Sequence, residues 1–275
     1  MNNWANPSKA SIQEVMEMAS SLVERAQSPD QENVNGALVN VFAPISGEQL
    51  LEVGCGVGSL CGLIAPGVAP GGKITGVDIS ADFVSFAQEQ IIRTDFSSHI
   101  QWGVSQAEFL PFIDAKFDGV LAARLLLHVS NPKNVLSELK RVVRPGGRVV
   151  VMDWDFETVT VDHSDRNLTR RVLHWRCDHR GGNNWSGRQL WRLMETTGLV
   201  NVQVVPYVSL ATDENDSLTR SIFRAAQVAQ DANVITQDEY TNWVEELKSC
   251  IAEGYFSASI VYFVVRGERQ SSPFQ

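Results

Sequence analysis

Two patterns of hydrophobic and polar residues alternate along most of this chain. Short apolar runs, bounded by glycine, proline or charged residues, alternate with longer stretches in which apolar residues recur every three or four positions. The short runs predict strands at 49–53, 73–77, 100–104, 117–122, 148–153, 200–208 and 259–266. Because neighbouring parallel strands are joined by a helical crossover, this alternation predicts an α/β fold with a mostly parallel, seven-stranded sheet.

The helical stretches lie at 11–26, 35–42, 58–64, 81–94, 132–143, 164–180, 187–197, 213–230 and 237–250. After residue 153 the regular alternation is interrupted by inserted helices. At 275 residues the chain can bury one sizeable core, either as one domain or as a domain with an added cap. We therefore expect a single domain over residues 1–267, with its core at about 44–155 and 186–267. The N-terminal helix 11–26 and the inserted helices 164–180 and 213–250 are expected to form a lid.

The most informative stretch runs from Leu50 to Gly58, Leu-Leu-Glu-Val-Gly-Cys-Gly-Val-Gly, where a predicted strand enters a glycine-rich turn. Glycine lets the backbone approach a ligand that a Cβ atom would push away. The next predicted strand leads to Asp78, 24 positions after Gly54. An acid at the tip of the second strand can accept hydrogen bonds from both hydroxyls of a ribose. This order of strand, glycine turn, helix, strand and acid predicts a nucleoside-binding unit.

The spacing of the glycines argues against a dinucleotide. A dinucleotide-binding turn has the pattern G-x-G-x-x-G or G-x-G-x-x-A, which seats a pyrophosphate on a helix N-terminus. Counted from Gly54 the sixth position is Ser59, and counted from Gly56 it is Cys61, so neither register fits. A nucleotide-dependent oxidoreductase is therefore the disfavoured alternative.

The pattern E-x-G-x-G-x-G from Glu52 to Gly58 resembles the first motif of the class I S-adenosylmethionine-dependent methyltransferases. Further likeness lies in 104–112 (Val-Ser-Gln-Ala-Glu-Phe-Leu-Pro-Phe), in 117–129 and in 139–147 (Leu-Lys-Arg-Val-Val-Arg-Pro-Gly-Gly). Together these segments cover about residues 48–153, and they look most like the small-molecule branch that includes ubiquinone and menaquinone biosynthesis methyltransferases. The family implies a Rossmann-like, doubly wound sheet and S-adenosylmethionine as the cofactor.

The resemblance also implies a set of cofactor-binding positions. In this chain they are Glu52, Gly54, Cys55, Gly56, Gly58, Asp78, Ile79, Gln106, Ala107, Arg124 and Leu125. By analogy the glycines line the methionine and ribose region, Asp78 binds the ribose hydroxyls, and Ile79 packs against adenine. Gln106 stands where the family often has an acid, so its amide oxygen would accept the hydrogen bond from the adenine amino group. Arg124 and Leu125 would face the sulfonium, and Glu52 would lie near the amino group of the cofactor.

Methyl transfer asks the protein mainly to align the acceptor, because the cofactor carries the hard chemistry. A phenol, hydroxyl or carbon acid also needs a general base, whereas a neutral amine does not. His128 is the leading base candidate because it follows the fourth predicted strand, at the edge where open α/β sheets bind ligands. The other reading of His128 is a packing residue under the next helix. Asp153, at the end of the fifth strand, is a second catalytic candidate or a plain turn acid.

Charge and composition narrow the partners. The net charge is −9 with no basic block, which argues against nucleic acid. No apolar run is long enough to predict a membrane span. The four cysteines lack a metal-like or paired spacing, so we expect free thiols, a cytoplasmic location and no metal. The expected function is methyl transfer to an O, N or C nucleophile of a small molecule, either a quinone-like metabolite or a natural product of secondary metabolism. A non-catalytic S-adenosylmethionine-binding protein is the remaining alternative, and the acceptor and oligomeric state stay open.

Overall fold

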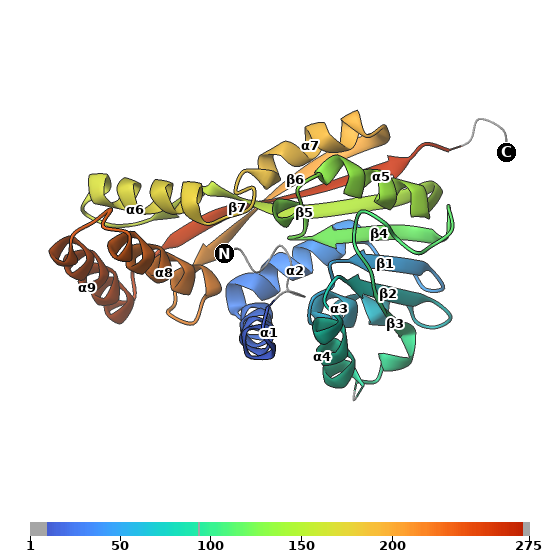
Figure 1. The fold of residues 1–275 in the computed structure, drawn as a ribbon, viewed down its shortest axis with the longest axis horizontal. Helices are drawn as coiled ribbons and strands as arrows, with labels where there is room; N and C mark the ends of the chain where they lie inside the picture. The colour runs from blue at the N-terminus through green and yellow to red at the C-terminus, as the bar shows by residue number, and fades with distance from the viewer. Residues whose placement is uncertain (1–9, 93, 272–275) are drawn as a thin grey trace.

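The computed structural model describes residues 10–92 and 94–271, so residues 1–9 of the predicted domain lie outside the described part of the chain. Within that part, seven strands form one sheet in the order β3-β2-β1-β4-β5-β7-β6 (Figure 1). The strands are β1 (Gln49–Val53), β2 (Lys73–Asp78), β3 (Ile100–Val104), β4 (Phe117–Ala123), β5 (Val143–Val161), β6 (Leu199–Ala211) and β7 (Ala258–Arg269). Only β7 runs antiparallel to its neighbours, and the predicted seven-stranded, mostly parallel Rossmann-like sheet is confirmed.

Helices cover both faces of this sheet. They are α1 (Ile12–Ala26), α2 (Pro29–Phe42), α3 (Ser59–Val68), α4 (Ala81–Ile91), α5 (Pro132–Val142), α6 (Arg166–His179), α7 (Ser186–Thr196), α8 (Ser217–Asp231) and α9 (Gln237–Glu253), with 3-10 turns η3 (Ser97–His99) and η4 (Leu126–His128). Successive strand residues point to opposite faces, so Leu50 packs with α2 and α3 while Leu51 packs with α5 and α7. None of the helices in the described residues has the length and hydrophobicity needed to cross a membrane.

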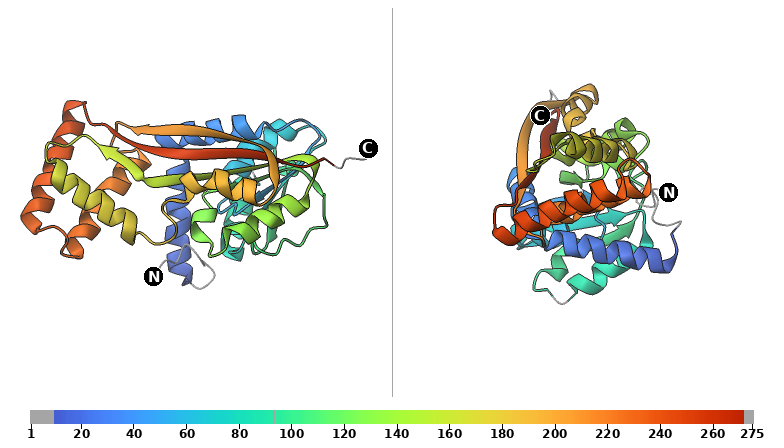
Figure 2. Two further views of the ribbon diagram at one scale, coloured as in Figure 1. Left: turned by 90° about the horizontal axis from the view of Figure 1, so that it is seen from above. Right: turned by 90° about the vertical axis from the view of Figure 1, so that its left-hand side faces the viewer.

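Three strands extend beyond the parallel core and carry the inserted helices. Figure 2 shows β5, β6 and β7 as long ribbons that reach from the core to a helical lobe made of α6, α8 and α9. Trp154, Phe156 and Tyr262 on the extended strands share one buried cluster with Val172 of α6 and Ile222 of α8. The lobe is therefore built on the same sheet as the core.

Two predicted elements were short by more than five residues. Helix α2 begins at Pro29 rather than at residue 35, because Ser28 and Pro29 supply an N-terminus and because the polar residues of its first turns are buried. Strand β5 continues to Val161 rather than ending at residue 153. The alternation from Asp153 to Val161, Asp-Trp-Asp-Phe-Glu-Thr-Val-Thr-Val, has the two-residue period of a strand and marks this extension.

Helix α2 ties the N-terminal region to the helical lobe. The buried carboxylate of Asp30 accepts hydrogen bonds from the backbone N–H groups of Ser217 (2.9 Å) and Leu218 (3.3 Å) at the start of α8. These are donors that a helix N-terminus leaves without intrahelical partners. Asp30 therefore caps α8 from outside that helix.

Candidate active site

The glycine-rich turn follows β1 and is held in place from β2. Gly54, Gly56 and Gly58 all adopt positive φ angles, of 77°, 52° and 81°. The Gly56 N–H donates to Asp78 Oδ2 at 2.9 Å, and the Ser80 N–H donates to Asp78 Oδ1 at 2.9 Å. Burial raises the pKa of Asp78, although these donors oppose the shift. The acid that the sequence places at the strand tip thus also shapes the turn.

The three glycines are required for different reasons. A Cβ at Gly54 would lie 3.0 Å from the Leu125 side chain, and one at Gly56 would lie 3.3 Å from Leu22 of α1. A Cβ at Gly58 would lie 2.5 Å from the Trp102 ring, which no ordinary packing allows. Gly58 therefore lets α3 pack against β3, whereas Gly54 and Gly56 border the open side of the turn.

A cavity of about 440 Å³, including its open mouth, lies over this turn at the carboxyl ends of β1 and β4. The strand order reverses between these two strands, which is the position where doubly wound sheets bind ligands. Its lining residues are Leu22, Arg25, Ala26, Gln31, Asn35, Glu52, Gly54, Cys55, Gly56, Val57, Ser59, Leu60, Ala123 and Arg124. Five of these residues come from helices α1 and α2, which lie side by side in Figure 1.

Glu52 is the buried acid of the cavity. It is 2% exposed, and its Oε2 accepts a hydrogen bond from the Cys61 thiol at 2.9 Å. Burial raises the pKa of Glu52 to about 7, although the Cys61 hydrogen bond and the charge of Arg124 both oppose the shift. Near neutral pH this carboxyl group can therefore gain or lose a proton in response to a charged ligand.

Two arginines face the cavity from opposite sides. Arg124 follows β4 with a positive φ of 55°, and its guanidinium donates to Asn35 Oδ1 at 3.0 Å and to Gln31 Oε1 at 3.5 Å. Both acceptors are neutral amides of α2. Arg25 lies in the last turn of α1, and burial followed by the charge of Arg124 lowers its pKa to about 9. Within the described residues neither arginine forms a salt bridge.

The predicted adenine-side residues lie at the ends of β2 and β3. The Ser105 N–H donates to the backbone oxygen of Asp78 at 2.9 Å, which brings the loop after β3 beside the tip of β2. In this loop Gln106 is exposed and Ala107 is buried, while Ile79 is half-buried. These residues, together with Gly58, Asp78 and Leu125, lie outside the lining of the cavity, and their roles toward the cofactor stay predictions.

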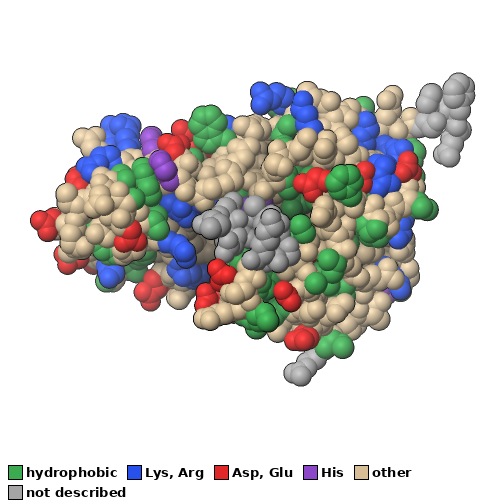
Figure 3. Space-filling view, viewed as in Figure 1, with side chains coloured by type: hydrophobic (Ala, Val, Ile, Leu, Met, Phe, Trp, Pro, Cys, Tyr) green, Lys and Arg blue, Asp and Glu red, His purple; other side chains and the backbone are tan. Residues whose placement is uncertain are grey.

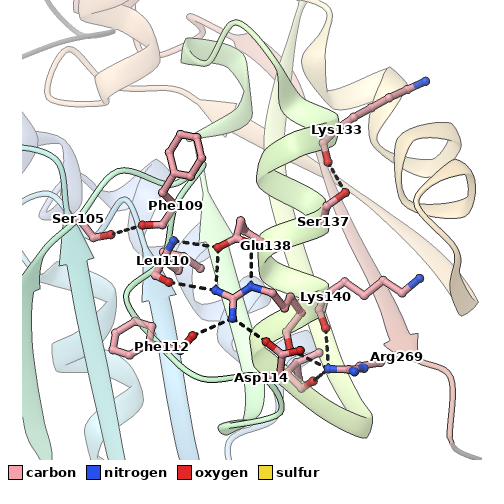
Figure 4. Close-up of polar contacts among 12 residues, drawn as sticks. Ser105, Phe109, Leu110, Phe112, Asp114, Lys133, Ser137, Glu138, Lys140 and Arg269 are labelled. Carbon is pink, nitrogen blue, oxygen red and sulfur yellow. Dashed lines mark hydrogen bonds and ion pairs between the residues drawn. The ribbon is translucent and has the colours of Figure 1, made fainter.

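Arg141 of α5 fastens this loop to the core (Figure 4). Its guanidinium donates to the carbonyl oxygens of Leu110 (3.0 Å) and Phe112 (2.7 Å) and pairs with Glu138 and Asp114. Glu138 in turn accepts from the Leu110 N–H at 2.9 Å. Two segments noted for their family likeness, 104–112 and 139–147, are thus connected by one arginine.

The two predicted catalytic residues lie beyond the cavity lining. His128 ends η4, and burial together with the charges of Arg180 and Arg25 lowers its pKa to about 4. Its Nδ1 is buried and has no hydrogen-bond partner among the described residues. Asp153 is completely buried, accepts a hydrogen bond from Ser186 Oγ at 2.5 Å, and has a pKa raised to about 7 by burial. Their catalytic roles stay predictions.

Several lining residues were missing from the prediction, namely Leu22, Arg25, Ala26, Gln31, Asn35, Val57, Ser59, Leu60 and Ala123. Val57, Ser59 and Leu60 neighbour the glycines, so the motif itself could have indicated them. The α1 and α2 residues carry no such signal, because only tertiary packing brings them over the turn. Across the described residues no cluster of His, Cys, Asp and Glu could hold a metal ion, and all four cysteines are free.

Comparison with known proteins shows what this chain is similar to. Residues 51–151 match the family model described as a methyltransferase domain. An uncharacterized 37.1 kDa protein in transposon TN4556 of Streptomyces fradiae is 32% identical over 224 residues, which are 80% of this chain and 62% of that protein. A demethylmenaquinone methyltransferase of Symbiobacterium thermophilum is 36% identical over 107 residues, which are 39% of this chain and 43% of that protein. This chain thus spans less than two thirds of the length of either relative.

Among solved structures, geranyl diphosphate methyltransferase in complex with SAM is similar over 87% of this chain and 85% of that chain. The TM-score is 0.55 and the sequence identity is 20%. At this identity the likeness is one of fold.

Proposed function

We propose that this chain is a class I S-adenosylmethionine-dependent methyltransferase, which transfers a methyl group from S-adenosylmethionine to an oxygen, nitrogen or carbon nucleophile of a small molecule. The observation that carries the proposal is the glycine turn held by Asp78, with the cavity that opens above it. The cavity presents both an acid, Glu52, and a cation, Arg25, to whatever occupies it.

The residues present fit this cofactor. The amino acid end of S-adenosylmethionine carries an ammonium and a carboxylate, which suit the carboxyl group of Glu52 and the guanidinium groups of Arg25 and Arg124. Gly54 and Gly56 line the cavity with backbone alone, so no side chain of the turn stands between the backbone and the cofactor. Each Asp78 oxygen accepts one backbone N–H and keeps capacity for a ribose hydroxyl. When bound, the cofactor would supply an electrophilic methyl group on a sulfonium.

The remaining task of the protein is to position and deprotonate the acceptor. His128 is neutral at pH 7 because its pKa is about 4, so its imidazole is free to accept a proton. The same low pKa makes it a weak base, which suits an acceptor that is already acidic, such as a phenol. We propose His128 as the base, and Asp153 as a residue that acts through its hydrogen bond with Ser186.

A small acceptor is supported by the enclosure of the cavity between the sheet and helices α1 and α2. The methyltransferase relatives include a demethylmenaquinone methyltransferase and an O-methyltransferase of Penicillium expansum, cnsE. These names support a quinone-like metabolite or a natural product of secondary metabolism as the acceptor. The net charge of −9 supports the absence of a nucleic-acid partner.

We further propose that residues 1–267 act as one domain, in which α1 and the lobe of α6, α8 and α9 form the lid over the acceptor. The shared buried cluster of the lobe and the sheet supports this organisation. A cytoplasmic location is supported by the four free thiols.

Binding of S-adenosylhomocysteine, the demethylated product of the cofactor, tests the cofactor site by calorimetry. Asp78→Asn keeps one oxygen acceptor but loses the charge and one acceptor oxygen, so we expect affinity to fall at least about tenfold. Asp82→Asn is the matched control, since Asp82 is an exposed acid in the first turn of α4. Equal affinity in the wild type and Asp78→Asn would contradict the placement of the ribose.

Turnover is tested with methyl-labelled S-adenosylmethionine and a metabolite extract of the source organism, read by mass spectrometry. A labelled product that disappears in Asp78→Asn establishes the transferase. Tight binding with no labelled product across extracts would favour the non-catalytic binding protein instead.

A further inference from the structure

Four arginines gather where the cavity meets the helical lobe, and none of them forms a salt bridge within the described residues. They are Arg25, Arg124, Arg176 and Arg180, and each is half-buried. On the face shown in Figure 3, Lys and Arg side chains gather at the boundary between the lobe and the sheet core. An arginine removed from water without a carboxylate partner is unusual, because unpaired buried charge is costly.

The positive charge of one arginine lowers the pKa of a neighbouring arginine in this set. Arg25 feels the charges of Arg124 and Arg180, and burial is the largest cause that lowers its pKa to about 9. Arg180 feels Arg176, and burial is again the largest cause that lowers its pKa to about 10. The segments outside the described residues, 1–9, 93 and 272–275, contain no Asp or Glu that could pair with them.

The acids near this cluster are already hydrogen-bonded or are only partly ionised near pH 7. Asp30 accepts hydrogen bonds from Ser28 and from the start of α8. Glu52 and Asp153 are buried and have pKa values raised to about 7. The cluster therefore keeps a positive excess that the nearby carboxyl groups of Asp30, Glu52 and Asp153 offset only in part.

The cofactor of the proposed function would not remove this excess. S-adenosylmethionine carries one carboxylate against an ammonium and a sulfonium, so its own net charge is positive. Its carboxylate can pair with one of the two cavity arginines, Arg25 or Arg124. Arg176, in the last turn of α6, and Arg180, the C-cap residue one turn later, would remain without an anion.

Arg180 and Arg176 also have the surroundings of a binding site. The Arg180 guanidinium lies over the rings of Trp154 (4.6 Å) and Phe156 (5.1 Å), and its N–H groups have no hydrogen-bond partner in the part of the chain that the structure describes. The Nε of Arg176 is buried and has no hydrogen-bond partner among the described residues. The charge of Arg180 also reaches His128, the proposed base, so the cluster borders the place of the chemistry.

We propose that the methyl acceptor carries an anionic group, a carboxylate or a phosphate, which Arg180 binds together with Arg176 while the nucleophile of the acceptor lies toward His128. This inference rests on the proposed methyl transfer for the identity of the ligand as an acceptor. The anion-binding property itself is independent of it.

The test uses calorimetry with three matched probes: phenyl phosphate, benzoate and the neutral benzyl alcohol. We expect wild-type protein loaded with S-adenosylhomocysteine to bind at least one anionic probe about tenfold or more tightly than benzyl alcohol. The preference between phenyl phosphate and benzoate distinguishes a phosphate from a carboxylate. Equal or absent binding of all three probes would overturn the inference.

Arg180→Gln should abolish the preference for the anion, whereas Arg170→Gln should retain it. Arg170 is the matched control, because it is an exposed arginine of the same helix. The melting temperature separates binding from a structural role: removal of an unpaired buried charge should leave the Arg180→Gln protein as stable as the wild type or raise its Tm. A lower Tm with the preference intact would assign Arg180 to structure and refute the inference.

The same titrations without S-adenosylhomocysteine separate the two proposals. Anion preference without binding of S-adenosylhomocysteine would support the anion site and refute the cofactor assignment. Binding of S-adenosylhomocysteine without anion preference would support the cofactor assignment and refute the anion site.

Discussion

At the scale of single residues, the site is governed by how far burial shifts ionisation. His128 lies among arginines and has a pKa of about 4, well below the ordinary 6.5 of histidine. A base with this pKa is deprotonated over the whole physiological range, so its availability does not limit the reaction near pH 7. The same environment that weakens His128 as a base keeps it ready to accept a proton.

This placement predicts the effect of pH on methyl transfer. Because a lowered pKa keeps His128 neutral until about pH 4, the acidic limb of kcat/KM should fall near pH 4 rather than near pH 6.5. Replacement of His128 by Gln should lower kcat roughly 10²–10⁴-fold if the acceptor needs a base. The measurement is a pH–rate profile of both proteins with the acceptor identified from labelled extracts. A His128→Gln protein with wild-type kcat would assign His128 to packing.

At the scale of elements, the loop that follows a strand can form part of a binding site because a neighbouring helix holds it in position. The loop after β3 has no regular structure. The Arg141 guanidinium of α5 nevertheless donates hydrogen bonds to two of its carbonyl oxygens, and Glu138 accepts a hydrogen bond from one of its N–H groups. A loop held in this way costs less ordering entropy when it contacts a ligand. Arg141, which lies in the family-like segment 139–147, therefore holds the loop of the family-like segment 104–112 in place before a ligand binds.

Loss of this anchor should affect binding more than folding. Arg141→Met removes the contacts to Leu110 and Phe112 while it keeps the aliphatic stem, so we expect affinity for S-adenosylhomocysteine to fall about tenfold. Lys133→Met on the same helix serves as the control, since the Lys133 side chain has no such contact in Figure 4. Calorimetry reports the affinity, and thermal unfolding should show only a small change. Unchanged affinity in Arg141→Met would separate this loop from the cofactor site.

Much of the elements and the turn could be predicted from the sequence, because their signals are local. The period of apolar residues marks β1 to β4, and the glycines with Asp78 mark the turn. Arg25, Gln31 and Asn35 could not be predicted as site residues, since they meet the cavity only after α1 and α2 fold over it. The start of α2 was missed for a related reason: its polar residues are buried by tertiary contacts, which blurs the amphipathic pattern.

At the scale of the whole molecule, the distribution of charge differs from its sum. The net charge of −9 indicates an acidic surface, whereas the interior beside the cavity holds unpaired arginines. Buried carboxyl groups oppose these cations only partly, because burial raises the pKa of Glu52 and of Asp153 to about 7. Stability should therefore depend on pH through groups that composition cannot identify.

The sign of this dependence follows from the direction of the shift. Glu52 has a higher pKa in the folded than in the unfolded state, so the folded state holds an extra proton between about pH 4.5 and 7. Its contribution to the free energy of unfolding is greatest below pH 4.5 and is lost as pH rises through 7. His128 has a lowered pKa, so its contribution is instead lost as pH falls from about 6.5 to 4.

Glu52→Gln removes only the first effect. The stability of the variant relative to the wild type should rise by about 2 kcal/mol between pH 5 and pH 8 and then stay constant. Urea unfolding at pH 5, 6, 7 and 8 gives the two curves. Parallel curves would place the pKa of Glu52 near its ordinary value.

The capping of α8 by Asp30 has a consequence for how distant parts of the molecule respond to one another. The next residue in α2, Gln31, donates to the Tyr262 hydroxyl and accepts from Arg124 at the cavity. The first turn of α2 therefore contacts both the lining of the cavity, through Gln31, and the start of α8, through Asp30. We predict that a ligand in the cavity changes the free energy of local opening at α8 through Gln31. Thermodynamic reciprocity then requires that the ordering of α8 change the affinity for that ligand by the same factor.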